Sequence, residues 1–212
     1  LTIDPVRQVI VESVTDQTAF LLSLVGVDPL LVGGLSHNGL PIAEKVYPHE
    51  STFWFEGNSQ PITYTIILAC TGIGSIAIFA GGILAVSAPW RRKLRALALT
   101  VSVIYVLNLF RNVFIAIFFG EQRMQILPGL VMTLFGTEDP QMVSYYVADR
   151  ILAQTGSVIA LVVITYFLVR ELPEITTLVD DLLFLLTGNE YDLATAFDRN
   201  IETESVATPS DD

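Results

Sequence analysis

Three residues in the apolar part of the sequence have side chains that could carry out a reaction: Cys70, Arg111 and Arg150. The thiolate form of cysteine is a nucleophile in acyl transfer, and a cation beside the sulfur stabilises that form. Arginine keeps its proton, so it cannot act as a base, but its N–H groups can donate hydrogen bonds to an oxyanion. If the fold brings them together, these residue types favour acyl transfer through a preformed thiolate.

Residues three and four positions apart share a helix face, so the neighbours of each candidate can be predicted. The two arginines have amide and hydroxyl side chains at this spacing, and small side chains beside Cys70 let a helix or a substrate backbone approach the sulfur. These faces should meet in one polar pocket. The expected supporting residues are Asn108 and Asn112 beside Arg111, Tyr146 and Gln154 beside Arg150, and Thr71, Gly72 and Gly74 beside Cys70.

Other chemistry has little support in the residue types. The two histidines, His37 and His49, lie in a polar loop, where either could serve as a general base but where histidine is most often a surface residue. One cysteine allows neither a disulfide within this sequence nor a site of clustered thiolates. We expect no metal and no cofactor.

The composition indicates that the candidates belong to a membrane protein. Hydrophobic residues make up 52% of the sequence and charged residues only 16%, which is too apolar for an ordinary soluble domain. The 22 acidic residues outnumber the 11 basic ones and gather outside the apolar runs. Such a negative soluble surface argues against a nucleic-acid partner and is typical of proteins that work in concentrated salt.

Three apolar runs, at about 62–88, 96–119 and 143–169, are long enough to cross a bilayer. Four basic residues separate the first two runs, and short basic loops remain in the cytoplasm. The fold class predicted is therefore an all-α integral membrane protein, a polytopic helical bundle with an extracytoplasmic loop and amphipathic helix. The basic residues of that loop are Arg91, Arg92, Lys93 and Arg95.

The sequence divides into three predicted parts. Residues 1–61 form an extracytoplasmic part, in which Asp4 and Pro5 begin an amphipathic helix that ends at Gly26 and a loop with a short hairpin follows. Residues 62–170 form a catalytic core of three spans, and residues 171–212 form a cytoplasmic interfacial helix with an acidic tail.

Counting along the predicted spans places the three candidates at one depth. At 1.5 Å per residue, Cys70, Arg111 and Arg150 lie very roughly 31, 24 and 30 Å from the basic residues at the cytoplasmic ends of their helices. An arginine inside a span is costly and is normally retained for a partner or a function. We therefore expect one site near the extracytoplasmic face of a multi-pass protein.

Each candidate alone also has a simpler explanation. Cys70 could be a packing residue, Arg111 could bind a lipid phosphate, and Arg150 could pair with Asp149 or a headgroup. Two alternatives to a transpeptidase therefore stay open. One is a non-enzymatic membrane subunit that binds an anionic lipid or ion, and the other is an intramembrane cysteine protease that releases a free acid.

The motif residues resemble the exosortase and archaeosortase family, a group of membrane cysteine transpeptidases. The resemblance rests on the run from Ala69 to Ile73, on Asn108-x-x-Arg111, and on Arg150, which follows Arg111 by 39 positions as Arg111 follows Cys70 by 41. An arginine at the third position is similar to the archaeosortase branch, and the likeness is clearest from Cys70 to about Arg170. Family members usually have several more spans before the cysteine, so we expect this chain to lack those N-terminal spans.

The resemblance implies a cysteine transpeptidase of the archaeal cell membrane. Its substrates would be surface proteins, such as an S-layer glycoprotein, with a C-terminal signal made of a Pro-Gly-Phe motif, a hydrophobic helix and a basic tail. By similarity, Cys70 would form a thioester with the substrate, and an amine-bearing membrane phospholipid would release it. Arg111 and Arg150 would then hold the thiolate, the oxyanion or the lipid phosphate.

Overall fold

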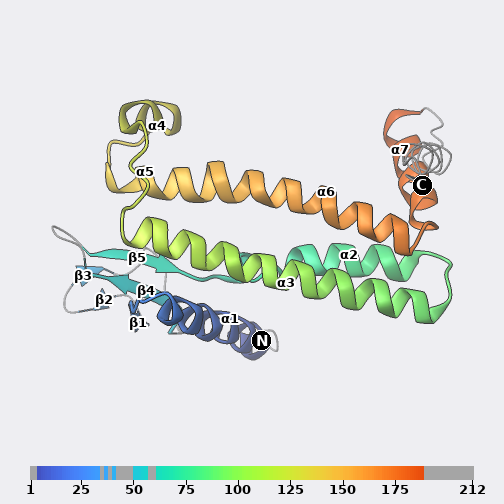
Figure 1. The fold of residues 1–212 in the computed structure, drawn as a ribbon, viewed down its shortest axis with the longest axis horizontal. Coiled ribbons are helices and arrows are strands. Elements are labelled where there is room, and N and C mark those ends of the chain that lie inside the picture. Colours follow the sequence, from blue (N-terminus) through green and yellow to red (C-terminus); the bar gives the residue numbers. More distant parts are fainter. Residues whose placement is uncertain (1–3, 34–35, 38–39, 42–49, 57–60, 189–212) are drawn as a thin grey trace, which may run out of the picture. The chain divides into compact units, whose positions relative to one another are not determined.

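The protein is described by a computed structural model that covers residues 4–33, 36–37, 40–41, 50–56 and 61–188, most of which are helical. Figure 1 traces the order of the elements. Two compact units emerge, one made of Leu1–Ile76 with Val103–Leu161 and the other of Ala77–Ser102 with Val162–Asp212. His49 and the acidic tail after Asn200 lie outside the described residues.

The helical elements follow the apolar pattern of the sequence. The longest is α3, and α5, η2 and α6 follow one another without a break. The helical elements are α1 (Asp4–Leu24), η1 (Leu68–Thr71), α2 (Ile73–Ala85), α3 (Trp90–Gly120), α4 (Pro128–Phe135), α5 (Gln141–Tyr145), η2 (Tyr146–Ala153), α6 (Gln154–Glu171) and α7 (Ile175–Thr187).

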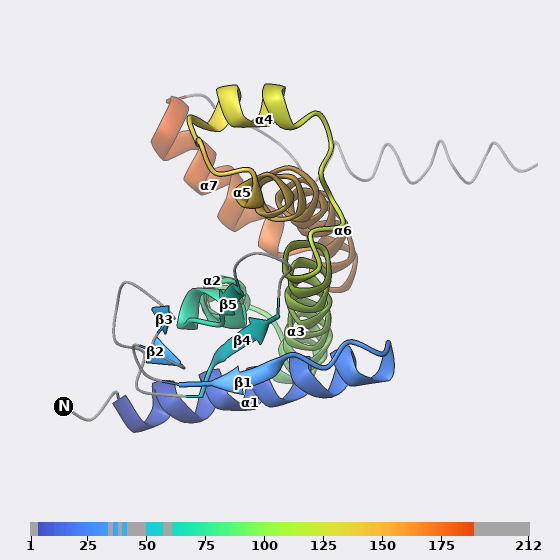
Figure 2. The same cartoon turned by 90° about the vertical axis from the view of Figure 1, so that its left-hand side faces the viewer.

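A small antiparallel sheet lies within the first unit, so the prediction of an all-α fold is wrong in this part. The strands β1 (Leu30–Val32), β4 (Thr52–Phe55) and β5 (Ile62–Thr65) pair in the order β1-β4-β5. A second pair, β2 (Ser36–His37) with β3 (Leu40–Pro41), forms the short hairpin expected in the loop. Figure 2 shows the larger sheet lying over α1.

The predicted amphipathic helix is confirmed as α1, and it packs on the sheet through one face. Val11, Val14 and Leu22 are buried against Phe53 of β4 and Tyr64 of β5. The same core includes residues from the second half of α3, so it holds helix and sheet together through burial of apolar surface. The α3 residues in this core are Ile115, Ala116 and Phe119.

The first predicted span is wrong over its N-terminal third. Residues 62–65 form β5, which pairs with β4 in the register Phe55↔Ile62 to Thr52↔Thr65, and α2 begins only at Ile73. The segment Ile-Thr-Tyr-Thr is rich in β-branched residues, and a neighbouring strand supplies its hydrogen bonds. Hydropathy averaged over a window cannot separate such a strand from a helix.

The other two predicted spans are confirmed as long apolar helices. Trp90–Gly120 and Gln141–Glu171 each have 31 residues and enough hydropathy to cross a membrane. Little of their most apolar stretches is buried by the protein itself, 28% in the first helix and 11% in the second. Apolar side chains that stay exposed along such helices fit a surface that faces lipid.

The second unit has its own apolar core and a set of basic contacts. Ile83 and Ala96 pack with Leu168 and Leu172. Within the predicted basic loop, Arg92 pairs with Glu174 at 3.0 Å and Lys93 Nζ donates to the carbonyl oxygen of Leu84. The second contact places a cation at the C-terminal end of α2, where free carbonyl groups favour positive charge.

Substitution of Gly120 by alanine should destabilise the first unit. An added Cβ would lie 2.5 Å from ring atoms of Phe55, so the ring or the helix must move, at a cost of about 1–3 kcal/mol. Thermal unfolding in detergent should show a clear drop for Gly120→Ala. Gly129→Ala is the matched control because its Cβ would meet nothing within 4 Å, and equal melting temperatures for the two variants would contradict the packing.

Candidate active site

Cys70 lies in a tight turn between the sheet and α2. Its backbone N–H donates to the carbonyl oxygen of Ile67, and the hydroxyl of Thr71 donates to that of Leu68. Gly72 follows with φ of +76°, a conformation that side-chain-bearing residues rarely adopt, and lets the chain enter α2. The nucleophile candidate is thus part of a hydrogen-bonded turn, directly before a helix N-terminus.

Two asparagines of α3 hold the carbonyl oxygen of Cys70. The side-chain amide nitrogens of Asn108 and Asn112 donate to this oxygen at 2.5 and 2.8 Å. The two residues are four positions apart, so their side chains lie on one helix face and converge on the same acceptor. A carbonyl oxygen has two lone pairs, and here both have a donor.

Tyr64 of β5 fixes the orientation of the second asparagine. Its hydroxyl donates to Oδ1 of Asn112 at 3.1 Å, which leaves the amide nitrogen of Asn112 directed at Cys70. Burial raises the pKa of the Tyr64 hydroxyl well above its usual value, the charges of Cys70 and Asp149 add to this rise, and Arg111 opposes it. Tyr64 therefore stays a neutral hydrogen-bond donor at physiological pH.

Gly72 also allows α3 to approach the turn. A Cβ at this position would lie 3.2 Å from Cβ and Cγ of Asn108. The predicted role of Gly72 was flexibility beside the sulfur, but the structure gives it a steric role. It makes room for the asparagine that holds the Cys70 carbonyl group.

The two candidate arginines meet one carboxylate, that of Asp149. Arg111 Nη2 lies 2.6 Å from Asp149 Oδ1, and Arg150 Nε lies 4.0 Å from Asp149 Oδ2. The exposed fractions of the three side chains differ, at 31% for Arg111, 11% for Asp149 and 56% for Arg150. Arg111 is therefore tightly paired and partly buried, whereas Arg150 is loosely held and open to solvent.

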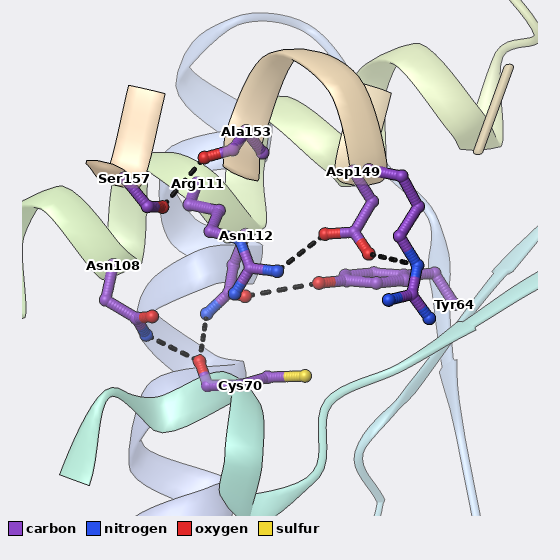
Figure 3. Close-up of polar contacts among 9 residues, drawn as sticks. Tyr64, Cys70, Asn108, Arg111, Asn112, Asp149, Ala153 and Ser157 are labelled. Atoms are coloured by element: carbon purple, nitrogen blue, oxygen red, sulfur yellow. Dashed lines mark hydrogen bonds and ion pairs between the residues drawn. The ribbon is translucent and has the colours of Figure 1, made fainter. Parts of the chain in front are cut away.

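The side chain of Cys70 is half-buried and its thiol is free. Figure 3 shows the sulfur pointing away from Asn108, on the side where Tyr64 lies. No hydrogen bond joins the sulfur to either guanidinium group, so the expected direct contact with both arginines is absent among these residues. The structure instead brings Cys70 and Arg111 into one cluster through α3 and Tyr64.

Several of the expected supporting residues lie apart from this cluster. Tyr146 stacks on Phe135, with ring centroids 4.4 Å apart, and Gln154 and Gly74 are exposed. The expected face of the third span is therefore shifted. Residues 146–153 form a π-helix, whose wider turn changes which side chains point to α3.

Sequence reasoning missed two members of the cluster, Asp149 and Tyr64. Asp149 had been considered only as a partner of Arg150, although a carboxylate in an apolar span is itself a signal because burying it is costly. Tyr64 gave no such signal, since it was assigned to a membrane helix. No group of three metal-binding side chains of the His, Cys, Asp or Glu type exists in the described part of the chain.

Comparison with known proteins agrees with this site and fold. Residues 2–138 match the family described as Transmembrane exosortase (Exosortase_EpsH). Archaeosortase A of Haloferax volcanii is 44% identical over 192 residues, which cover 91% of this chain and 60% of that protein. Archaeosortase A of Natronomonas pharaonis is 38% identical over 182 residues, or 85% of this chain and 55% of that protein. No solved structure matches the chain.

Long apolar helices and a transmembrane exosortase match together define a membrane protein. The chain belongs to the exosortase family, within its archaeosortase branch. It spans only about 60% of the length of the first of these relatives and 55% of the second. The sources of both relatives agree with an archaeal, salt-loving origin.

Substitution of Gly72 by alanine should loosen the turn that holds Cys70. The positive φ costs a side-chain-bearing residue about 1–2 kcal/mol, and the new Cβ would press on Asn108. Because Cys70 is the one cysteine of the sequence, the rate of alkylation by iodoacetamide reports on it directly. We expect Gly72→Ala to change this rate and lower the melting temperature. Gly74→Ala, which meets nothing within 4 Å, should leave both unchanged, and a silent Gly72→Ala would contradict the steric role.

Proposed function

We propose that the protein is a membrane cysteine transpeptidase that cuts the C-terminal sorting signal of surface proteins and joins them to a membrane lipid. The observation that carries this proposal is the arrangement at Cys70. Its carbonyl oxygen is held by two amides, its thiol is free, and a pair of arginines lies in the same cluster. The substrates of an S-layer kind and the Pro-Gly-Phe signal come from the family resemblance.

Charge balance supports a thiolate at Cys70. Asp149 offsets one of the two arginine charges, so the cluster of Arg111, Arg150 and Asp149 has one positive charge left. A thiolate would neutralise it. Cys70 also precedes the N-terminus of α2, where the helix dipole favours negative charge.

The reaction would follow two acyl-transfer steps. In the first, the Cys70 thiolate attacks the carbonyl carbon of the substrate peptide, the S–C bond forms, the peptide C–N bond breaks, and the leaving amine takes up a proton from water. In the second, the amine of a phospholipid attacks the thioester, a C–N bond forms and the thiolate is released as the amine loses a proton. In both steps, N–H groups of Arg111 and Arg150 would donate to the oxyanion, a role that requires no proton transfer from arginine.

The site would lie near the extracytoplasmic face. In α3 the basic residues around Arg91 precede Arg111 by about 30 Å at 1.5 Å per residue, and short basic segments stay in the cytoplasm. This places the secreted substrate and the outer lipid headgroups at the same level as Cys70. Multi-pass topology follows from the two long apolar helices together with the resemblance to longer relatives.

Replacement of Cys70 by serine should stop processing of a signal-bearing surface protein and leave the amount of protein in the membrane unchanged. Gel mobility of the substrate, with and without its signal, measures this loss. Ser75→Ala, in the exposed first turns of α2, is the matched control and should process normally. Normal processing by Cys70→Ser would instead favour the non-enzymatic, anion-binding alternative. Mass analysis of the new C-terminus separates lipid attachment from release of a free acid, the product of a protease.

A membrane-impermeant maleimide should label Cys70 in intact cells. The expected labelling follows from the extracytoplasmic position and from the half-exposed thiol, and peptide mass analysis measures it. A cysteine introduced as Ser87→Cys, beside the basic segment, should react only after the cells are broken in a Cys70→Ser background. The opposite pattern of protection would show that the topology is inverted.

A further inference from the structure

Asp149 occupies a position that the reaction scheme does not yet explain. Its side chain is 11% exposed, it comes from the π-helical stretch η2, and its two oxygens face two different arginines. A carboxylate within a candidate membrane helix is costly unless it is paired. A residue whose only purpose was packing would be apolar here, so the charge itself needs a reason.

The two arginines use this carboxylate differently. The bond from Arg111 Nη2 is short, at 2.6 Å, whereas Arg150 Nε stays 4.0 Å away with an exposed guanidinium group. Arginine has a long side chain with several rotatable bonds, and a short charge-assisted bond restricts it to few conformations. Asp149 therefore fixes Arg111 much more than Arg150.

Arg111 keeps one donor that Asp149 does not use. Its Nε–H is buried and has no hydrogen-bond partner among the described residues. A buried donor without a partner is costly, and such groups are found where a ligand or a reacting atom takes the free place. Neighbouring positions of the same helix, Asn108 and Asn112, hold the backbone of Cys70.

We propose that Asp149 is a positioning residue that acts through Arg111: it binds the Nη2 end of the guanidinium group and so keeps the Nε–H edge available to the thiolate or oxyanion at Cys70. This inference rests on the proposed function for its meaning in catalysis. Its geometric content, a dependence of Cys70 on Asp149 by way of Arg111, is independent of any substrate. A π-helical turn in place of a regular one is what carries the carboxylate to Arg111.

The test uses alkylation of Cys70 by iodoacetamide at one neutral pH, in the protein reconstituted in lipid. We expect Asp149→Asn and Arg111→Gln each to react about three- to tenfold more slowly than the wild type, because a displaced or absent cation stabilises the thiolate less. The double variant should react no more slowly than Arg111→Gln alone, since both changes remove the same interaction. Glu138→Gln removes a charge from an exposed residue and should leave the rate unchanged.

Two results would overturn the inference. Faster alkylation in Asp149→Asn would mean that the carboxylate only weakens the positive field at the sulfur, and an unchanged rate would mean that Arg111 keeps its place without it. Asp149→Glu keeps the charge and guards against loss of folding in the asparagine variant. It should recover part of the rate, and a rate no better than that of Asp149→Asn in a folded protein would also contradict positioning.

The catalytic arm of the test is separate. In a processing assay, Asp149→Asn should lower kcat with little change in KM for the signal peptide, because the residue does not touch the substrate. If the wild type processes nothing, the proposed function fails while the alkylation rates still decide the role of Asp149. If the wild type processes substrate and Asp149→Asn alters only KM, the positioning role fails while the transpeptidase remains.

Discussion

The structure around Cys70 depends on one interaction, the pair of hydrogen bonds from Asn108 and Asn112 to the carbonyl oxygen of Cys70. These bonds join a turn that follows the sheet to the middle of a long apolar helix. They require a glycine at position 72, where a side chain would collide with Asn108, and a tyrosine at position 64, which orients Asn112. With the carbonyl group bound to α3, the sulfur points away from it (Figure 3). The backbone of the nucleophile candidate is thereby fixed and its thiol is left free to react.

Positive charge is the second requirement, and the protein supplies it in a low-polarity surrounding at a cost. Two arginines in apolar helices are expensive to insert, and a third charge, that of Asp149, lowers this cost while leaving the cluster positive. The division is uneven, because Arg111 is bound closely and Arg150 is exposed. This asymmetry separates a cation whose position is fixed near the turn from one that can move toward a ligand at the membrane surface.

The sequence predicted the chemistry of the site better than its geometry. Helical spacing placed Asn108, Arg111 and Asn112 on one face, and this is confirmed because α3 is regular along its length. The same spacing failed on the next long helix, where the π-helical residues 146–153 bring Asp149 rather than Tyr146 or Gln154 to the cluster. The strand Ile62–Thr65 was hidden within an apolar run, since its identity depends on pairing with β4, a contact distant in sequence. Local patterns therefore revealed which residues matter, whereas departures from regular helix determined which of them meet.

The central claim is that Cys70 is a nucleophile that becomes covalently joined to the substrate. The most direct measurement is to quench the protein in acid during turnover of a signal-bearing peptide and to examine the Cys70 peptide by mass spectrometry. The account predicts an added mass equal to the acyl part of the cleaved substrate, removable by hydroxylamine as a thioester is. Processing of the substrate with Cys70 never found modified, under conditions that trap thioesters of other cysteine enzymes, would contradict it.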